Sequence, residues 1–398
     1  MTYMTVQQAA LTWSISERRV QKYCTEGRIA GARKFGRSWQ IPANAAKPEN
    51  PRRHSAPGAG HRLARSRISS GTTLMPLMNT PFRPGECRAQ LDAMPEGPAK
   101  EIATAEYLYF SGQAEQAACR MERYLTIRSR NTRLSACLLY AFASLSDGRI
   151  PQARRALEAV QATLAQDPDP RGSAAAPFVA ATMAVLLHLP LPGGLPPARD
   201  FLPLLPTGLR AFALYVQAHY LYLREDYRKS IGMVEATLAM GAEAYPIPAI
   251  YLHLVAVMDY MSLRRPEQAQ QHLLAAWELA RPDDLIEGFG EHHGLLGGML
   301  EATIKPQWPE DFRRIIEITY RFSAGWRRIH NPDTGDRVAD NLSTTEFAMA
   351  MLAARGWTNQ EIAAHMNLSP HTVKRYLSRV MEKLGIAHRQ DLKQYMLP

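Results

Sequence analysis

The stretch LSPHTVKRYLSRVMEKLG, residues 368–385, predicts a helix whose two faces differ in chemistry. Its apolar residues recur at steps of three and four and therefore share one face: Val373, Leu377, Val380, Met381 and Leu384. The opposite face carries polar and cationic side chains: His371, Lys374, Arg375, Ser378 and Arg379. Ser369 is a favourable N-cap, Pro370 fits the first turn, and Gly385 can end the helix. One face is suited to packing and the other to binding.

Three further helices are predicted around this one. Two residue pairs have the spacing of capping boxes, which open helices: Ser343 with Glu346, and Thr358 with Glu361. These helices end near Gly356 and Met366, and a short last helix is expected at about 389–396. The tight turn 367–369 joins two of the four helices, which predicts a helix-turn-helix whose polar face enters the DNA major groove. The alternative is a solvated basic face on an ordinary helical bundle.

The same region resembles the LuxR-type DNA-binding domain from end to end. The segments that carry the resemblance are LSTTE (342–346), GWTNQEIA (356–363), LSPHTVK (368–374) and KLGI (383–386), with Arg389. The resemblance implies a four-helix domain that binds promoter DNA, often as a dimer through its last helix. It also implies that Lys374, Arg375 and Ser378 face the bases, where Lys, Arg and Ser can bind base edges or phosphate. The DNA-binding residues expected here are Ser369, His371, Thr372, Lys374, Arg375, Ser378 and Arg379.

Three positions depart from that family pattern. Thr345 stands where Arg is usual, Ala350 where Leu is usual, and Tyr376 where His is common. Thr345 removes a polar contact that the usual Arg could make, and Ala350 fills slightly less of the core than the usual Leu. Neither position lies on the recognition face.

Residues 1–46 predict a second unit. A capping box at Thr5 and Gln8 opens a helix through residue 12, and after a turn at 13–15 Ser16 caps a helix over 17–26. The inner face of the second helix is formed by Val20, Tyr23 and Cys24. Two short strands, 33–35 and 39–41, follow with a Gly-containing loop of three residues between them, as in a hairpin. Two helices and a hairpin in this order predict a winged helix.

This N-terminal unit looks like the small excisionase/MerR-related winged-helix domains. The matching segments are ISERRV (15–20), EGRI (26–29) and KFGRSWQIP (34–42). In that family the second helix enters the major groove and the wing touches the DNA backbone. The residues that the resemblance places at DNA are Ser16, Arg18, Arg19 and Lys22, with Lys34 and Arg37 on the wing. The alternative is that this unit contacts protein.

The net charge of +10 is distributed unevenly along the 398 residues. Residues 1–70 carry +10, residues 71–341 carry −3 and residues 342–398 carry +3. Basic ends on a slightly acidic middle are typical of a protein with two contacts to a polyanion. Residues 47–100 are rich in Pro, Gly, Ser and Arg and lack apolar periodicity, so a disordered basic linker is expected there.

Residues 101–330 predict helical pairs throughout. Four pairs have a small residue shortly after their turn, at Ala117, Ala153, Ser230 and Ala269, and a degenerate pair is expected near 177–205. The pattern resembles tetratricopeptide-type hairpins, in which small residues let helices approach closely. Such repeats usually bind proteins or peptides on a concave surface. An irregular α-helical domain is the alternative.

Several classes of protein are disfavoured by what the sequence lacks. There is no phosphate-binding GxxxxGK[ST] loop, no GxSxG or Cys/His constellation, and no metal-ligand spacing around His292 and His293. Cys24, Cys87, Cys119 and Cys137 have no CxxC spacing, and we expect reduced, mostly buried thiols. The longest apolar run, 178–189, is too short to span a bilayer. We therefore expect no enzyme activity, cofactor, metal or membrane contact, and a cytoplasmic, nucleoid-associated location.

Together these patterns predict a mainly α protein. Its expected parts are a winged helix at 1–46, a linker at 47–100, a helical-repeat domain at 101–330, a linker at 331–341 and a LuxR-type domain at 342–398. The expected function is DNA-binding transcriptional regulation in a bacterium. The expected partners are double-stranded DNA, a second copy of the chain, RNA polymerase, and a protein or peptide on the helical repeats. The alternative function is an interaction scaffold whose helix-turn-helix units bind protein.

Overall fold

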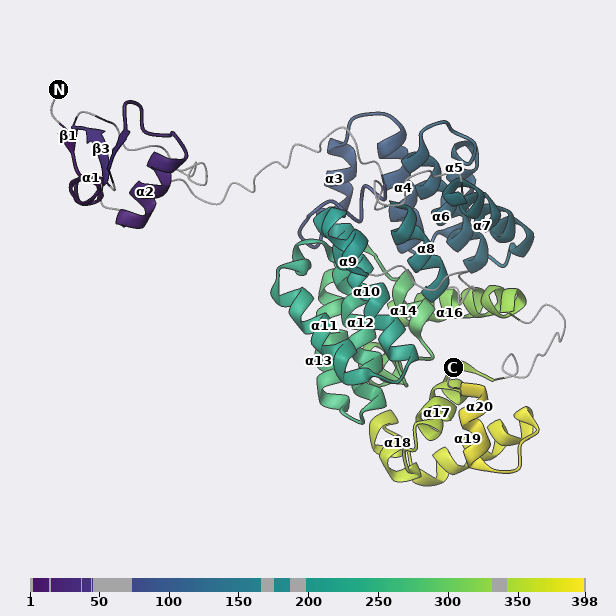
Figure 1. The fold of residues 1–398 in the computed structure, drawn as a ribbon. Coiled ribbons are helices and arrows are strands. Elements are labelled where there is room, and N and C mark those ends of the chain that lie inside the picture. The colour runs from purple at the N-terminus through teal and green to yellow at the C-terminus, as the bar shows by residue number, and fades with distance from the viewer. Residues whose placement is uncertain are drawn as a thin grey trace. The chain divides into compact units, whose positions relative to one another are not determined.

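The computed structural model describes residues 3–13, 16–36, 38–43, 45, 74–165, 175–186, 198–330 and 342–396. The chain divides into two compact units, Met1–Arg67 and Ile68–Pro398 (Figure 1). Helices dominate the described residues, and their few strands all lie in the first unit, so the predicted mainly α fold class is confirmed.

The first unit combines two helices with a small antiparallel sheet. Its elements are β1 (Tyr3–Met4), α1 (Val6–Trp13), α2 (Glu17–Thr25), β2 (Arg33–Phe35) and β3 (Ser38–Pro42). The strand order is β1-β3-β2, so β1 extends the expected hairpin by one strand. Two residues are too few to show a strand's alternation, which is why β1 was not predicted. The buried core of the unit includes Trp13, Val20, Tyr23, Cys24 and Ile41.

The two predicted helix starts in this unit differ in their caps. The box at α1 is present, because the Thr5 N–H donates to Gln8 Oε1 over 2.8 Å and the Gln8 N–H donates to Thr5 Oγ1 over 3.2 Å. Ser16 occupies the N-cap of α2, but its side chain makes no capping hydrogen bond, so that part of the prediction is wrong. The Ser16 carbonyl instead accepts from the N–H groups of Arg19 and Val20, which closes the first turn through the main chain.

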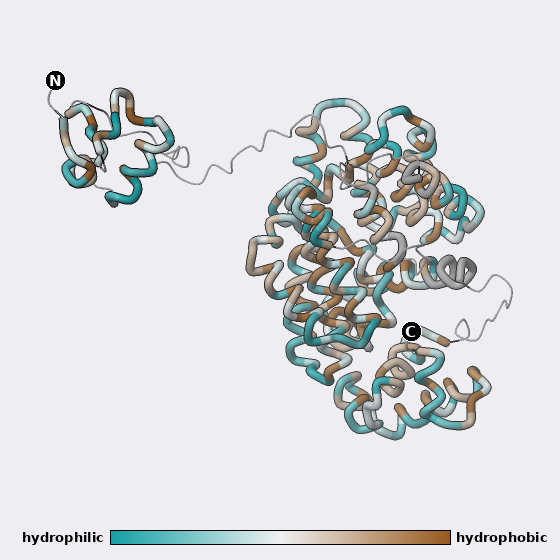
Figure 2. Tube along the Cα trace, viewed as in Figure 1, coloured by the Kyte–Doolittle hydropathy of each residue, from teal (hydrophilic) through white to brown (hydrophobic). Residues whose placement is uncertain are grey.

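The second unit contains four pairs of adjacent helices. The pairs are α4 (Pro98–Phe110) with α5 (Ala114–Met121), α6 (Arg130–Ser146) with α7 (Ile150–Ala165), α10 (Thr207–Leu223) with α11 (Tyr227–Ala239), and α12 (Pro246–Ser262) with α13 (Pro266–Ala280). Figure 2 shows apolar and hydrophilic residues alternating along several of these helices, as in amphipathic helices, whereas α12 is mostly apolar and buried on all sides.

The four pairs share one turn geometry. Each turn has three residues, and the middle one adopts a left-handed conformation: Gly112 (φ +81°), Gly148 (φ +71°), Glu225 (φ +60°) and Arg264 (φ +58°). In each pair, the residue directly after the left-handed one donates its N–H to the carbonyl five residues earlier, as Arg265 does to Tyr260 over 2.8 Å. This is the hydrogen bond of a Schellman motif, which satisfies a carbonyl at the helix end.

The small residues expected after these turns lie in the core. Ala117, Ala153, Ser230 and Ala269 are all fully buried. The predicted recurrence of helical pairs is therefore present, whereas their assignment to the tetratricopeptide family stays a prediction. The expected degenerate pair corresponds in part to α8 (Ala175–Leu186), and residues 187–197 lie outside the described residues.

Several short elements and the long helix α16 complete this region. They are α3 (Cys87–Ala93), η1 (Glu122–Tyr124), α9 (Ala198–Phe201), η2 (Leu202–Leu204), η3 (Ala242–Ala244), η4 (Arg281–Asp283), α14 (Glu287–His292), the π-helix η5 (Leu300–Ile304), α15 (Lys305–Gln307) and α16 (Pro309–His330). Helix α16 packs against α14 and α6. No helix among the described residues is long and apolar enough to cross a membrane.

The predicted linker 47–100 is wrong over residues 74–100, which belong to the fold. Leu77 is fully buried, and the N–H groups of Leu77 and Met78 donate to the buried Glu106 carboxyl over 2.8 and 3.0 Å. Asp283 accepts in the same way from the N–H of Cys87, over 2.9 Å. Side-chain carboxyls from distant helices replace the regular hydrogen bonding that the sequence pattern lacks here. Residues 46–73 lie outside the described residues.

Candidate nucleic-acid interface

Four helical segments form the C-terminal part of the second unit. They are α17 (Thr344–Ala354), α18 (Asn359–Met366), α19 (Pro370–Leu384) and a last segment in which η6 (Arg389–Asp391) precedes α20 (Leu392–Met396). Both predicted capping boxes are present, at Ser343 with Glu346 and at Thr358 with Glu361. The predicted helix ends are also confirmed, since Gly356 and Gly385 have φ values of +81° and +65°.

Helix α19 is held by its apolar face. Val373 and Val380 are fully buried, Leu377 and Leu384 nearly so, and Met381 is half-buried. The helix packs against α17 and α18. The turn between α18 and α19 begins at Asn367, which adopts φ +52°, a left-handed conformation that Asn tolerates better than most residues. These contacts fix which side of α19 remains open to solvent.

The outer face of α19 contains the residues predicted to bind DNA. His371, Lys374, Arg375, Ser378 and Arg379 are exposed. Among the described residues, no hydrogen bond or ion pair engages Lys374 or Arg375, so both cations are available to a ligand.

Ser369 and Thr372 are committed to the start of the helix. The Thr372 N–H donates to Ser369 Oγ over 3.0 Å, and the two hydroxyls lie 2.8 Å apart. Ser369 is exposed and Thr372 is half-buried. Their predicted contact with DNA stays a prediction, and any such contact has to share oxygens that already cap α19.

Glu346 links the first turn of α17 to the last turns of α19. Its carboxyl is buried, accepts from the Ser343 N–H over 2.8 Å, and pairs with Lys383 Nζ over 2.7 Å. Arg379 Nη1 lies 3.9 Å from the same carboxyl. Burial alone would raise the pKa of Glu346, but the hydrogen bonds from Lys383 and Ser343 outweigh it and lower the pKa. Arg379 thus lies on the exposed outer face of α19 and is also within ion-pair distance of the Glu346 carboxyl.

The predicted DNA-binding residues of the first unit lie at its surface where they are described. Ser16, Arg18, Arg19, Lys22 and Lys34 are exposed, and Arg37 lies outside the described residues. The Arg19 Nε–H donates to the Tyr23 hydroxyl over 3.2 Å, and Lys22 Nζ lies 3.7 Å from Glu26. Arg18 and Lys34 have no such partner among the described residues. The interface proposed for this unit rests on these exposed cations.

Polar contacts join the helix-turn-helix to the helical pairs on the side away from the α19 outer face. The Arg355 guanidinium donates through Nη2 to the Tyr222 hydroxyl over 3.0 Å and to the Leu295 carbonyl over 2.7 Å. Arg264, the left-handed turn residue of α12 and α13, donates to the Gly356 carbonyl. His365 Nε2 lies 3.2 Å from the Gly297 carbonyl.

Three glycines in the segment after α14 let that segment lie close to the helix-turn-helix. A Cβ atom at Gly294 would lie 2.1 Å from the Phe347 ring, one at Gly297 would lie 2.6 Å from Arg355 Nη1, and one at Gly298 would lie 2.6 Å from Met366 Sδ. Gly297 and Gly298 also have positive φ, of +59° and +78°. We refer to residues 294–298 as the glycine segment.

Sequence reasoning did not find these contacts. Nothing in the sequence around Arg264 and Arg355 sets them apart from other arginines. Arg264 lies 92 residues from its partner Gly356, and Arg355 lies 133 residues from its partner Tyr222. The sequence does carry one signal of close packing here, which is the density of glycines at 288–298.

Comparison with known proteins agrees with this geometry. Residues 340–396 match the family model described as "Bacterial regulatory proteins, luxR family". The chain is also similar to the HTH-type transcriptional regulator MalT of Klebsiella pneumoniae (strain 342), with 29% identity over 152 residues. Those residues are 34% of this chain and 17% of the relative, so this chain covers a small part of the relative's length. Residues 340–396 are thus a luxR-family helix-turn-helix.

Proposed function

We propose that the protein is a DNA-binding transcription regulator that recognises promoter DNA with the outer face of α19. The observation that carries the proposal is the pair of unengaged cations, Lys374 and Arg375, on a luxR-family helix-turn-helix whose opposite face is packed. A helix of this kind fits the major groove, and Lys or Arg can donate to guanine O6 and N7. Ser378, exposed on the same face, adds a hydroxyl that can bind a base or a phosphate.

The two other parts have proposed roles that depend on this one. The first unit makes a second DNA contact through α2 and the β2–β3 hairpin, supported by the exposed Arg18 and Lys34. The helical pairs carry sensing or assembly, supported by their contacts with the helix-turn-helix at Arg355 and Arg264. A homodimer would place two copies of α19 on half-sites about one helical turn apart.

A pull-down of genomic fragments tests the proposal directly. The full chain is compared with versions that lack 1–46 or 335–398, and with Lys374→Ala. We expect discrete sites with the full chain, their loss without 335–398, and about 10- to 100-fold weaker binding at those sites for Lys374→Ala. Lys229→Ala removes another exposed cation, which lies on α11 and pairs with Asp226, and serves as the control, with binding unchanged.

The outcomes separate the candidate functions. If Lys374→Ala weakens specific and non-specific binding equally, Lys374 contacts phosphate rather than bases. If the full chain enriches no site above background and binds protein instead, the interaction scaffold replaces the regulator.

A further inference from the structure

A cavity of about 40 Å³ that is partly open to solvent lies among the helical pairs. Its walls come from α4, α6, α8, α10, α12 and α14, together with the segment that precedes α3. One water molecule needs about 10–15 Å³ of such space, and a cavity that binds benzene has about 150 Å³, so a molecule with an aromatic ring can enter only if side chains of the wall move. Met75 and Met78 line it as well, and unbranched methionine side chains can move to admit a larger group.

The wall of the cavity is aromatic. The aromatic lining residues are Tyr109, Phe110, Phe142, Phe178, Phe212 and Tyr251. The rings contact one another at angles near edge to face, with centroids 5.9 Å apart for Phe110 and Tyr251 and 5.6 Å apart for Phe212 and Tyr251. The faces of aromatic rings carry negative charge density and attract cations.

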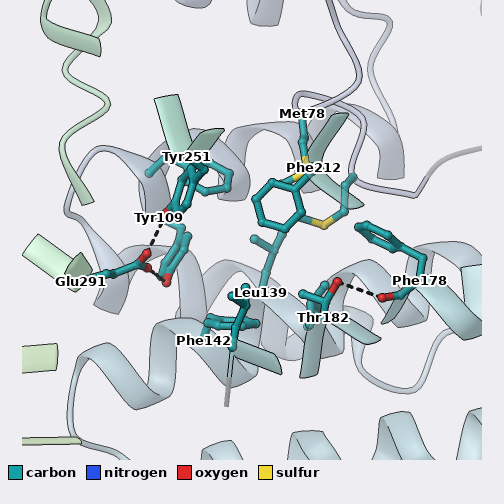
Figure 3. Close-up of a pocket in the computed structure, with 13 residues that line it drawn as sticks. Met78, Tyr109, Leu139, Phe142, Phe178, Thr182, Phe212, Tyr251 and Glu291 are labelled. Atoms are coloured by element: carbon teal, nitrogen blue, oxygen red, sulfur yellow. Dashed lines mark hydrogen bonds between the residues drawn. The ribbon is translucent and has the colours of Figure 1, made fainter. Parts of the chain in front are cut away.

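One carboxyl, that of Glu291, reaches the cavity. Figure 3 shows the hydroxyls of Tyr109 and Tyr251 turned toward it, with Phe178 and Thr182 at the other end of the cavity. Tyr109 donates to Glu291 Oε1, and Tyr251 donates to Oε2 over 2.9 Å. A carboxylate has about four acceptor positions, so two remain for a ligand. The only other polar side chain in the lining, Thr182, already donates to the Phe178 carbonyl over 2.8 Å.

Within the described residues, the two carboxyls at this end of the cavity share a single neighbouring cation. Glu287 precedes Glu291 by one helical turn and is fully buried, whereas Glu291 is half-buried. The nearest cation, Arg321, lies 3.6 Å from Glu287, and among the described residues none contacts Glu291. Burial raises the pKa of both carboxyls, and the charge of Glu291 further raises that of Glu287, to about 8. A second cation at Glu291 would offset the cost of burying this pair.

We propose that this cavity binds a small organic cation, an amine with a compact apolar body, whose ammonium group donates to Glu291 while its body contacts the aromatic wall. A neutral hydrocarbon of the same shape would fill the space but leave the carboxyl without a partner. An anion would meet no cation at Glu291 among the described residues. The chemistry of the lining therefore selects for a positive charge at one end and apolar atoms at the other.

The position of the cavity gives such a ligand a route to the helix-turn-helix. Glu291 lies near the end of α14, and the glycine segment begins three residues later, where it contacts Phe347, Arg355 and Met366. A ligand that moves Glu291 also moves the start of that segment. The role of the ligand as an effector of DNA binding rests on the proposed function, whereas the binding site does not.

Calorimetry with the full chain tests the site without DNA. Benzylamine is the probe, with benzyl alcohol and toluene as neutral molecules of the same shape. We expect benzylamine to bind at least about 10-fold more tightly than either, since a charged hydrogen bond contributes about 1.5–3 kcal/mol. Glu291→Gln should reduce benzylamine binding to the level of benzyl alcohol. Glu301→Gln, a buried carboxyl outside the cavity that pairs with His293, should leave binding unchanged.

A second variant keeps the test decisive if Glu291→Gln does not fold. Leu139→Phe adds volume at the cavity wall, retains Glu291, and should abolish benzylamine binding. Toluene binding as tightly as benzylamine, or benzylamine binding that survives both variants, would overturn the proposal. Binding of benzylamine with an unchanged pattern of hydrogen exchange at 287–298 would place the ligand elsewhere and overturn it as well.

Discussion

Replacing Glu346 by Gln should loosen the attachment of α19 to α17 while leaving the capping box intact. Gln is as acceptable as Glu at the third position of a capping box, so the bond with the Ser343 N–H is kept. The pair with Lys383 Nζ at 2.7 Å is lost. Hydrogen bonds between charged groups contribute about 1.5–3 kcal/mol. Because the Lys383 side chain is 31% exposed and can return to water, we expect the lower end, about 1.5 kcal/mol.

Native-state hydrogen exchange on the full chain measures this loss locally. A loss of about 1.5 kcal/mol corresponds to slightly more than 10-fold faster exchange of α17 and α19 amides, with the helical pairs unaffected. Glu361→Gln makes the same change in the other capping box, where the carboxyl is exposed, and should have little effect. Lys383→Met should cost about as much as Glu346→Gln, and the two together no more than either alone.

The pH dependence gives a second check on the same contact. The folded-state pKa of Glu346 is lowered, so its stabilisation is present above the unfolded-state pKa of about 4.3 and is lost as the pH falls through the folded value. The wild-type protein should therefore lose α17 and α19 protection in acid, and Glu346→Gln should lack this component. Equal exchange in wild type and Glu346→Gln at pH 7 would refute the reasoning, because the pair would then contribute nothing.

Three further predictions concern other parts of the second unit. Gly298→Ala places a Cβ 2.6 Å from Met366 Sδ at φ +78°, and should weaken the contact between the glycine segment and α18 by about 1–3 kcal/mol, measured as faster exchange in both. Burial lowers the pKa of His253 to about 3, so protonation of the unfolded state should destabilise α12 and α13 as the pH falls from about 6.5. His253→Asn should reduce this loss of stability between pH 7 and pH 5, measured by denaturant titration at both values. Burial raises the pKa of Cys87 to about 12, so iodoacetamide should label the exposed Cys119 in the folded protein and leave Cys87 unmodified.

The parts of the fold that follow local rules were predicted well from the sequence. The capping boxes at Ser343 and Thr358 depend on residues three positions apart, and the buried face of α19 depends on steps of three and four. Both signals lie within one or two helical turns. The same is true of α2, where Val20, Tyr23 and Cys24 are buried as predicted.

Features that depend on distant partners were not predicted. All four helical pairs were predicted, but the left-handed conformation at Glu225 and Arg264 was not, because no glycine marks those two turns. Residues 74–86 contain no helix or strand, and the N–H groups of Leu77 and Met78 bind the Glu106 carboxyl, a contact that no local sequence pattern shows. The cavity is assembled from residues on six helices, and no local pattern singles out Glu291 among the other carboxyls.

The contact at the glycine segment also has an evolutionary consequence. Exchange of a domain between genes as an independent module requires that the domain has no partner-specific surface. Here Phe347, Arg355 and Met366 meet positions where even one added methyl group would collide. A recombination event that joined this domain to a different helical partner would leave those side chains without their fitted neighbours. The two parts of the unit are therefore expected to be inherited together, and substitutions on one side of the contact should be matched by substitutions on the other.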